Sequence, residues 1–463
     1  MRMRFQHWLA RKHPGPARYL TVAPFPLQGR PPSIHLVDNQ QDELMVSYSA
    51  QHHPIDKLPP ELLGEIFMRC LPQRCWKPHS PKVHEAPMLL CQICSYWREL
   101  ALSLPMLWSS FSANLGHRIR AGHVSLIQSW IERSCDQPLF LDLDLRSSDS
   151  LMSCMLRLYL ANMHRWGNAA FSIDDSSVGD LLAISEGNTH LLESFGINAS
   201  ECTTKAINEI SSIFLSFPNL RRLRWYGNST PTALLGMSFS TLTHIKLLCP
   251  LPLNECIRFI ARCLQLRDIE LDDVEPSSAS LTLPIVTLPH LASLYVKNGV
   301  SELLDHFTLP SLRSLNFPRL NLQTFENFVS RSSCKLESFY LGDFVRLAEE
   351  EVIRCLRMPC LQSLHELGIH ARGLTDRTVA LLHYSGSEAN SKGNILPHLR
   401  VFSIETCKTT DGVFSDMIAS RWRPAQGGSP ASLQWISVSF EGTQHKIDHS
   451  RLQEFAAGGL TVS

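Results

Sequence analysis

The sequence has no excess of charge of either sign. Its 463 residues include 43 Lys and Arg against 43 Asp and Glu, and charged residues make up 19% of the chain, below the roughly 25% typical of globular proteins. Proteins that bind nucleic acid or an anionic membrane surface usually carry a basic excess that attracts phosphate groups. The composition therefore argues against nucleic acid and against membrane lipids as partners.

The sequence also lacks long apolar runs and an ordered set of cysteines. No stretch of 18 apolar residues occurs, so we expect no membrane-spanning helix. The 14 cysteines are scattered without the spacing of a disulfide framework, and no signal peptide precedes them. We therefore expect reduced thiols and a cytoplasmic location, a nuclear location, or both.

The motifs of common enzyme classes are missing as well. The sequence has no phosphate-binding or dinucleotide-binding glycine pattern, and no Gly-x-Ser-x-Gly turn around a nucleophilic serine. His365 and His370 flank a Glu-Leu-Gly-Ile segment, which is one residue longer than the zinc-protease spacing that puts two histidines on one helix face. We therefore expect a protein that is not an enzyme, with no catalytic residue and no cofactor.

A group of cysteines and histidines before residue 95 resembles part of a zinc site. Cys91 and Cys94 have the spacing of half such a site. Both lie in an apolar stretch that predicts a helix, where cysteine commonly serves as a small apolar residue. We therefore predict no metal site. The group consists of Cys70, Cys75, His79, His84, Cys91 and Cys94.

Against these absences stands one short motif, apolar-x-x-apolar-x-apolar, which occurs ten times between Leu192 and Val438. Its first positions lie 21 to 35 residues apart. A fixed motif at such a period indicates stacked supersecondary units rather than one compact globule. The ten copies are Leu192/Phe195/Ile197, Leu220/Leu223/Trp225, Leu242/Ile245/Leu247, Leu266/Ile269/Leu271, Leu291/Leu294/Val296, Leu312/Leu315/Phe317, Leu336/Phe339/Leu341, Leu364/Leu367/Ile369, Leu399/Phe402/Ile404 and Leu433/Ile436/Val438. Weaker copies precede them at Phe140/Leu143/Leu145 and Phe171/Ile173.

Segments that predict helices separate the copies. They cover residues 204–217, 253–264, 323–330, 349–357, 376–384 and 412–421. One strand and one helix per unit resembles the leucine-rich repeat, although the Asn or Cys expected after the last apolar position appears only sometimes, as Asn228 and Cys407. The resemblance implies an irregular α/β solenoid over residues 138–455, with loops between Tyr384 and Leu396 and between Trp422 and Ala431.

The residues that alternate with the apolar positions are expected to face outward on the concave side of the sheet. A basic block on two units adjoins an acidic block on the next unit. Mixed charges with aromatic side chains are typical of a protein-binding face, although they would also suit a merely solvated sheet surface. We expect an unknown protein substrate to contact Arg222, Arg224, Tyr226, Lys246, Tyr295 and Trp435.

The segment before the repeats is different in kind. Pro60 suits the first turn of a helix, Glu61 suits its positive end, and Pro72 ends it. A second apolar stretch runs from Met88 to Ala101. The apolar stripe of the first helix consists of Leu62, Leu63, Ile66, Phe67 and Cys70.

This segment resembles an F-box. The resemblance rests on the Leu-Pro-x-Glu-Leu-Leu-x-x-Ile-Phe opening from Leu58, on Ile93, Cys94, Trp97 and Arg98, and on the closing Pro105, Leu107 and Trp108. It implies a small all-α domain of three helices that docks onto a Skp-family adaptor and through it a cullin. The expected adaptor-binding residues are Leu58, Pro59, Leu62, Ile66 and Leu71. Internal packing is the alternative for Ile66 and Leu71, and it is the expectation for Trp97 and Trp108.

The expected organisation follows from these boundaries. Residues 1–50 predict a disordered arm, because residues 1–37 contain six Lys or Arg, six Pro and no acidic residue; a transit peptide is the alternative, but prolines interrupt it. An F-box-like domain (51–112), a connecting helix (113–137), the solenoid (138–455) and a tail (456–463) follow. Together they imply the substrate-recognition subunit of a ubiquitin ligase, with a leucine-rich scaffold unconnected to ubiquitination as the alternative.

Overall fold

The computed structural model describes most of the chain from Pro54 onward. The described residues are 54–72, 82–113, 121–146, 150–182, 184, 188–277, 283–317, 319–341, 348–370, 374–384, 394–422, 432–442 and 445–463. The arm predicted for residues 1–50, and most of the two loops predicted after Tyr384 and Trp422, lie outside them.

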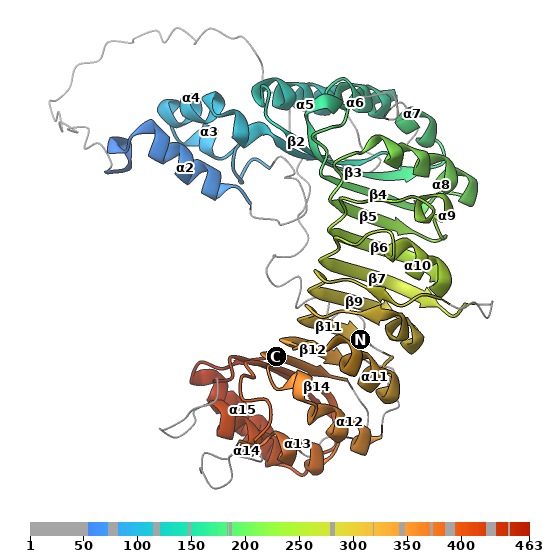
Figure 1. Ribbon diagram of the computed structural model, residues 1–463. Helices are drawn as coiled ribbons and strands as arrows, with labels where there is room; N and C mark the ends of the chain where they lie inside the picture. Colours follow the sequence, from blue (N-terminus) through green and yellow to red (C-terminus); the bar gives the residue numbers. More distant parts are fainter. Residues whose placement is uncertain are drawn as a thin grey trace, which may run out of the picture.

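One parallel sheet of 14 strands runs through the described part of the chain, and its strands lie side by side in chain order (Figure 1). The protein is therefore of the α/β class, and its sheet is compatible with the predicted solenoid. Two further short strands, β8 (Val286–Thr287) and β10 (Phe307–Thr308), pair with each other. The 14 strands are β1 (Ser110–Ala113), β2 (Leu139–Asp144), β3 (Trp166–Asp174), β4 (Ser194–Glu201), β5 (Arg222–Gly227), β6 (His244–Pro252), β7 (Asp268–Glu275), β9 (Ser293–Asn298), β11 (Ser314–Phe317), β12 (Ser338–Leu341), β13 (Glu366–Ile369), β14 (Val401–Cys407), β15 (Trp435–Phe440) and β16 (Thr461–Val462).

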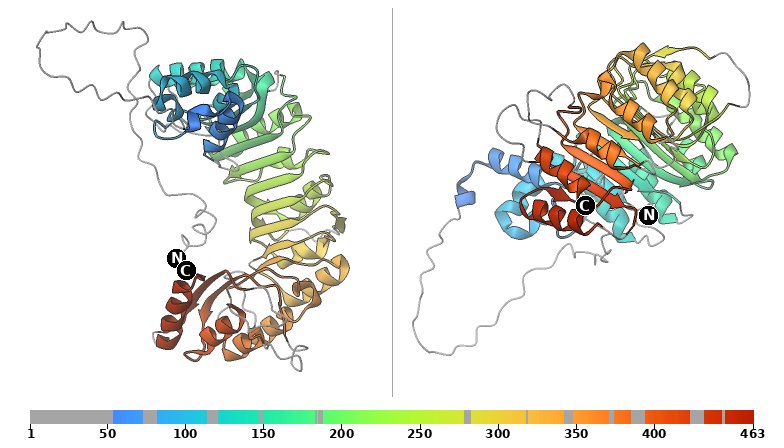
Figure 2. Two further views of the ribbon diagram at one scale, coloured as in Figure 1. Left: turned by 90° about the vertical axis from the view of Figure 1, so that its left-hand side faces the viewer. Right: turned by 90° about the horizontal axis from the view of Figure 1, so that it is seen from below.

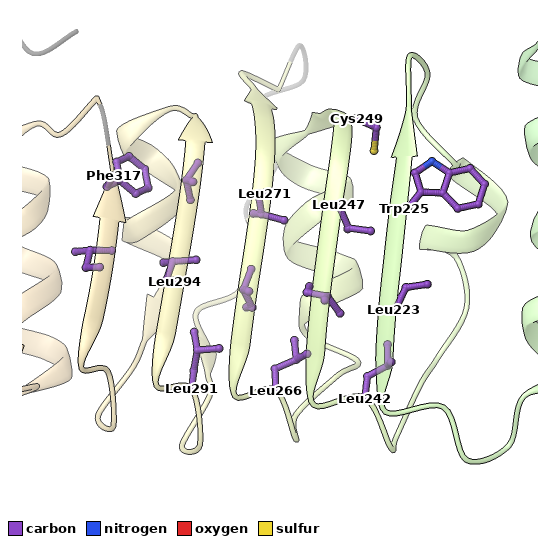
Figure 3. Close-up of a cluster of buried hydrophobic side chains, with 14 of the residues drawn as sticks. Leu223, Trp225, Leu242, Leu247, Cys249, Leu266, Leu271, Leu291, Leu294 and Phe317 are labelled. Carbon is purple, nitrogen blue, oxygen red and sulfur yellow. The ribbon is translucent and has the colours of Figure 1, made fainter. Parts of the chain in front are cut away.

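The ten motif copies coincide with strands β4 to β7, β9 and β11 to β15, and equivalent apolar positions pair in register. Leu223 pairs with Ile245, which in turn pairs with Ile269. These side chains are at most 1% exposed and stack from strand to strand in the core. Figure 3 shows the next row, Trp225, Leu247 and Leu271, which pair in the same way. The period of the motif is thus the period of the sheet, because each copy places its apolar residues over those of its neighbours.

Helices cover the outer, convex side of the arched sheet, and the strands line its inner side (Figures 1 and 2). Side-chain caps start several of them: the Thr203 hydroxyl accepts the N–H of Ala206, and the Asn321 amide oxygen accepts that of Thr324. The helices of the sheet region are α5 (Ala121–Arg133), α6 (Ser150–Leu160), α7 (Val178–Leu182), α8 (Thr204–Ser211), α9 (Thr232–Leu235), α10 (Leu253–Ile260), α11 (Leu322–Ser332), α12 (Glu349–Leu356), α13 (Asp376–Leu382), α14 (Val413–Trp422) and α15 (Lys446–Ala457), with short 3-10 segments η3 (Met163–Arg165), η5 (Ser212–Ser216), η6 (Ser301–His306) and η7 (Pro359–Leu361).

All six predicted helical segments contain a helix, with differences at their ends. The segment predicted for 204–217 changes from α8 to the 3-10 helix η5 at Ser212, and the one predicted for 253–264 leaves the α-helix after Ile260. The sheet extends beyond the predicted solenoid range of 138–455 at both ends. Strand β1 pairs with β2, and β16 pairs with β15.

A small helical unit precedes the sheet; we use this name for the described residues between Pro54 and Trp108. It contains η1 (Pro54–Lys57), α2 (Pro60–Cys70), α3 (Leu90–Ile93), α4 (Ser95–Ser103) and η2 (Pro105–Trp108). Cys94 separates α3 from α4 because its backbone is extended. The segment predicted as a connecting helix (113–137) contains α5, which lies in the chain between strands β1 and β2 of the sheet. None of the helices in the described residues is both long and apolar enough to cross a membrane.

Candidate protein-binding surfaces

Helix α2 splits its apolar stripe between the core and the surface. Pro60 occupies the first turn, Glu61 lies at the positive end and Arg69 at the negative end of the helix dipole. Leu63 and Phe67 are fully buried, whereas Leu62 is 54% exposed. An apolar stripe wider than the small core can bury therefore leaves part of the helix facing outward.

The helical unit exposes an unusual share of apolar side chains. Of the 14 large apolar side chains exposed among the described residues, eight belong to this unit of fewer than 60 residues. A concentration of exposed apolar side chains in one small unit is a feature of binding surfaces. We call these eight the exposed apolar set. It consists of Leu62, Ile66, Val83, Leu89, Ile93, Tyr96, Leu102 and Met106.

The five residues predicted to bind the adaptor have different environments. Pro59 and Leu62 are exposed, Ile66 is 36% exposed, and Leu58 is half-buried. Leu71 is half-buried and packs against the core. The alternative of internal packing is therefore wrong for Ile66 and right in part for Leu71.

The two tryptophans of the helical unit serve packing, as expected. Trp97 is half-buried, and its ring lies 4.9 Å from that of Phe67. Trp108 is fully buried; its indole N–H donates to the carbonyl of Ala101, and its ring meets that of Trp130 on α5 at 4.7 Å. Because the indole N–H of Trp130 donates to the carbonyl of Ser110 on β1, these contacts join the helical unit to the first strand of the sheet.

The concave face carries a basic block on strands β5 and β6. Arg222 pairs in register with His244, and Arg224 pairs with Lys246. All four side chains are half-buried. The guanidinium of Arg224 donates to the amide oxygen of Asn168 at 3.3 Å, and burial lowers the pKa of Arg224 because it disfavours the charged form.

An acidic block follows on β7. Glu270 pairs with Lys246 at 2.7 Å across β6 and β7, and Asp272 pairs with Lys297 of β9 at the same distance. Tyr295 lies beside this block, and burial raises its pKa, as do Glu270 and Asp272. The charges of the two blocks are thus partly compensated within the sheet.

Five of the six predicted substrate-binding residues lie close together, from β5 to β9. Two of them are in contact: the Lys246 ammonium lies 5.9 Å from the centre of the Tyr226 ring. Trp435 lies on β15 near the other end of the sheet. It is therefore not part of the group that the other five form.

The sequence reading missed a hydrogen-bonded network further along the concave face. The Tyr340 hydroxyl bonds the ring of His370 at 2.7 Å, and that ring lies 3.1 Å from the carboxylate of Glu405. The hydrogen bond to His370 lowers the pKa of Glu405. Tyr340 lies across Gly368. A glycine at an outward strand position was the available signal, because only a missing side chain leaves room for the neighbouring ring.

The histidine pair around that glycine is not arranged as in a zinc protease. Glu366 to Ile369 form strand β13, as predicted, so His365 and His370 point to opposite sides. In the cysteine group, Cys91 lies in α3, but Cys94 is exposed and accepts the N–H of Trp97 as the cap of α4. The expected role of Cys94 as an apolar helix residue was therefore wrong. Cys75 and His79 lie outside the described residues.

One other group in the described residues has ligand atoms close enough for a metal ion: Asp411, His445 and Asp448. Its carboxylates already cap helices. Asp411 accepts the N–H groups of Ile447 and Asp448, and Asp448 accepts that of Ser415 and bonds His445. Burial raises the pKa of Asp411, but these backbone hydrogen bonds outweigh it and the pKa is lowered. The group is accounted for by helix capping.

The two surfaces differ in character: one carries exposed apolar side chains, and the other carries charges and aromatic rings. The sequence matches no protein-family model and no curated protein.

Proposed function

We propose that this protein is the substrate-recognition subunit of a cullin-based ubiquitin ligase, with an F-box in its helical unit and leucine-rich repeats in its sheet region. The exposed apolar set carries the proposal. Leu62, Ile93 and Met106 are each more than half exposed in a unit whose Leu63 and Phe67 fill a small core. Apolar side chains in such positions are stabilised when a partner covers them.

The mechanism is proximity without chemistry in this chain, and it requires no cofactor or metal. The helical unit binds a Skp-family adaptor and through it a cullin. The concave face holds a protein substrate through residues such as Arg222, Arg224 and Tyr226. Holding the substrate next to the transferred ubiquitin raises its effective concentration.

The test is capture of a purified Skp-family adaptor by the full chain. We expect the wild type to bind and Leu62→Ala/Ile66→Ala to bind at least about tenfold more weakly, because truncating anchor residues at an interface centre costs over about 1 kcal/mol each. Leu215→Ala is the matched control, since Leu215 is 75% exposed on η5, away from the helical unit. A folded wild-type chain that does not bind the adaptor refutes the proposal.

The second candidate is a leucine-rich scaffold whose helical unit covers the end of the sheet. The junction through Trp108 and Trp130 favours it, because the unit packs on the element next to the first strand. In that case the chain captures no adaptor, and Leu62→Ala/Ile66→Ala leaves the binding of a partner at the concave face unchanged.

A further inference from the structure

Two arginines of β5 lie beside small residues of β4 on the concave face. Arg222 pairs with Ser194 of β4, and Arg224 pairs with Gly196. Arg224 lies across Gly196, since a Cβ atom placed on that glycine would be 3.3 Å from the Arg224 Nε and 3.5 Å from Ala170. On that side the neighbours of Arg224 are therefore the small residues Gly196 and Ala170 together with Asn168, which accepts its hydrogen bond.

Ser194 adds a polar group that the fold does not use. Its neighbour Phe195 points into the core, so the Ser194 side chain lies on the concave side. Ser194 is 1% exposed, and its hydroxyl has no hydrogen-bond partner among the described residues. A buried hydroxyl without a partner is costly, so an acceptor that reaches it is stabilised. The flexible chain of Arg222, in register with Ser194, can turn outward with a ligand and open that access.

The electrostatics favour a single negative charge at this place. Burial lowers the pKa of Arg224; Tyr226 and Asp142 oppose this in part, and the charge of Arg222 adds a smaller lowering effect. An anion bound here would relieve that penalty. On the other side, Lys246 is engaged by Glu270 at 2.7 Å. The anion is therefore expected over β4 and β5 rather than over β6 and β7.

The same surroundings distinguish a carboxylate from a phosphate. A phosphate monoester carries close to two negative charges at neutral pH and would meet Asp142 on β2 and Glu270 on β7, on either side of the two arginines. A carboxylate carries one charge and matches the planar fork of a guanidinium. Aspartate and glutamate side chains of a protein segment fit that description.

We propose that Arg222, Arg224 and Ser194 form a carboxylate subsite that binds an acidic side chain of a partner protein. The inference rests on the proposed role of the concave face in substrate binding and names the chemistry of that substrate. It places an acidic segment of the partner across β4 and β5.

The test uses the full chain and fluorescently labelled peptides with blocked ends. We expect a hexaglutamate peptide to bind and a hexaglutamine peptide to show no binding at the same concentrations. Arg222→Gln/Arg224→Gln should weaken binding of the glutamate peptide about tenfold or more, because the variant loses the charge-assisted hydrogen bonds to the carboxylates. Ser194→Ala should weaken it a few-fold. Lys297→Ala, which removes another cation of the concave face, is the matched control and should leave binding unchanged.

Several results would overturn the subsite. They are equal binding of both peptides, no effect of Arg222→Gln/Arg224→Gln in a variant with wild-type thermal stability, and an effect of Lys297→Ala as large as that of the arginines. If a phosphoserine peptide of the same length binds more tightly than the hexaglutamate peptide, the subsite is one for phosphate rather than for carboxylate. If the double variant fails to fold, the single variant Ser194→Ala still tests the subsite, because unchanged peptide binding by that variant would contradict it.

Adaptor capture, measured on the same Arg222→Gln/Arg224→Gln variant, separates this inference from the proposed function. We expect capture to be unchanged, since the arginines lie on β5 and the adaptor is expected at the helical unit. If the wild type binds the glutamate peptide but no adaptor, the ubiquitin-ligase proposal fails while the subsite stands. If it captures the adaptor but not the peptide, the subsite alone fails.

Discussion

At the scale of single residues, the concave face depends on which positions lack a side chain. Gly368 on β13 is buried, and a Cβ atom placed on it would lie 2.2 Å from the Tyr340 ring. Tyr340 bonds His370 from that position at 2.7 Å. The glycine is therefore required by the ring beside it rather than by its own backbone conformation.

Gly368→Ala should lower the free energy of unfolding by about 1–3 kcal/mol, the range typical of overpacking a filled site. The added methyl group forces the Tyr340 ring away from His370, and the loss is measured by denaturant unfolding. Gly179→Ala is the control: nothing lies within 4 Å of its added methyl, and it sits in helix α7, so stability should hold or rise. In a Tyr340→Ser background Gly368→Ala should cost little; an unchanged cost there contradicts the account.

For single residues, the sequence predicted which side of a strand a side chain faces better than it predicted whether that side chain is exposed or buried. The alternation that puts Arg222 and Arg224 outward is local, because successive side chains of a strand point to opposite sides. The exposure of Ile66 and the partial burial of Leu71 depend on what the other helices cover, which no local pattern contains. The Tyr340 network was missed for the same reason, since its three members come from different units.

At the scale of elements, acidic side chains of one unit cap the helix of the next. The carboxylate of Glu349, at the start of α12, accepts the backbone N–H groups of Thr375 and Thr378 at the start of α13. Asp376 does the same for Thr410, and Asp175 for Thr203. Each cap satisfies donors that a helix start leaves without partners, and it ties neighbouring units together.

Glu349→Gln should destabilise the protein by about 1 kcal/mol near pH 7, the usual cost of losing a helix cap. Burial raises the pKa of Glu349, but its hydrogen bonds to Thr378 and Thr375 outweigh this and lower the pKa below the ordinary value of 4.5. A carboxylate with a lowered folded pKa stabilises the fold above its unfolded pKa, and that stability is lost as the pH falls through the folded pKa. The variant and the wild type should therefore converge in stability as the pH falls from above 4.5 through the lowered folded pKa.

Thermal midpoints between pH 3 and pH 7 measure this effect, and hydrogen exchange locates it at α13. Glu337→Gln is the control because Glu337 makes an exposed ion pair with Arg313, and such pairs contribute about 0–1 kcal/mol. A stability difference for Glu349→Gln that stays constant down to pH 3 argues that the carboxylate charge is irrelevant.

Elements were predictable where one periodicity covered a whole segment. The ten motif copies gave ten strands, and the helices between them appeared within a few residues of their expected ends. The break at Cys94 was not predicted, because the apolar stretch from Met88 to Ala101 has helical spacing on both sides of it. The caps by Glu349 and Asp376 join residues 26 to 34 positions apart, beyond the reach of a local signal.

At the scale of the whole molecule, the helical unit and the sheet share one hydrophobic core. Buried residues from Leu63 in α2 to Leu460 beside β16 belong to a single cluster. Trp108 occupies the junction: it is fully buried, meets the Trp130 ring at 4.7 Å, and has the Arg133 guanidinium 4.7 Å above its own ring. The sequence-based division of the chain into a helical domain and a solenoid does not reveal this shared core. In the structure, η2 is followed almost directly by β1.

Trp108→Ala should uncouple the two regions. Removing a fully buried tryptophan typically costs about 3–5 kcal/mol, and here the loss falls on the contacts between the helical unit and α5. We expect protection of α2 and α4 from hydrogen exchange to drop first, while β4 to β7 keep theirs, because the stacked strands do not contact Trp108. In the wild type, α2 and α4 should be protected together with the neighbouring strands β1 and β2.

Trp435→Ala serves as the control for losing a tryptophan elsewhere: Trp435 is half-buried on β15, and its removal should leave exchange in α2 and α4 unchanged. If Trp108→Ala lowers protection uniformly over the sheet, the two regions unfold as one unit and the junction is not a boundary. If it lowers protection in α2 and α4 alone, the orientation of the helical unit depends on this one side chain. Under the proposed function, that variant should bind the adaptor more weakly, because α2 carries the exposed Leu62 and Ile66.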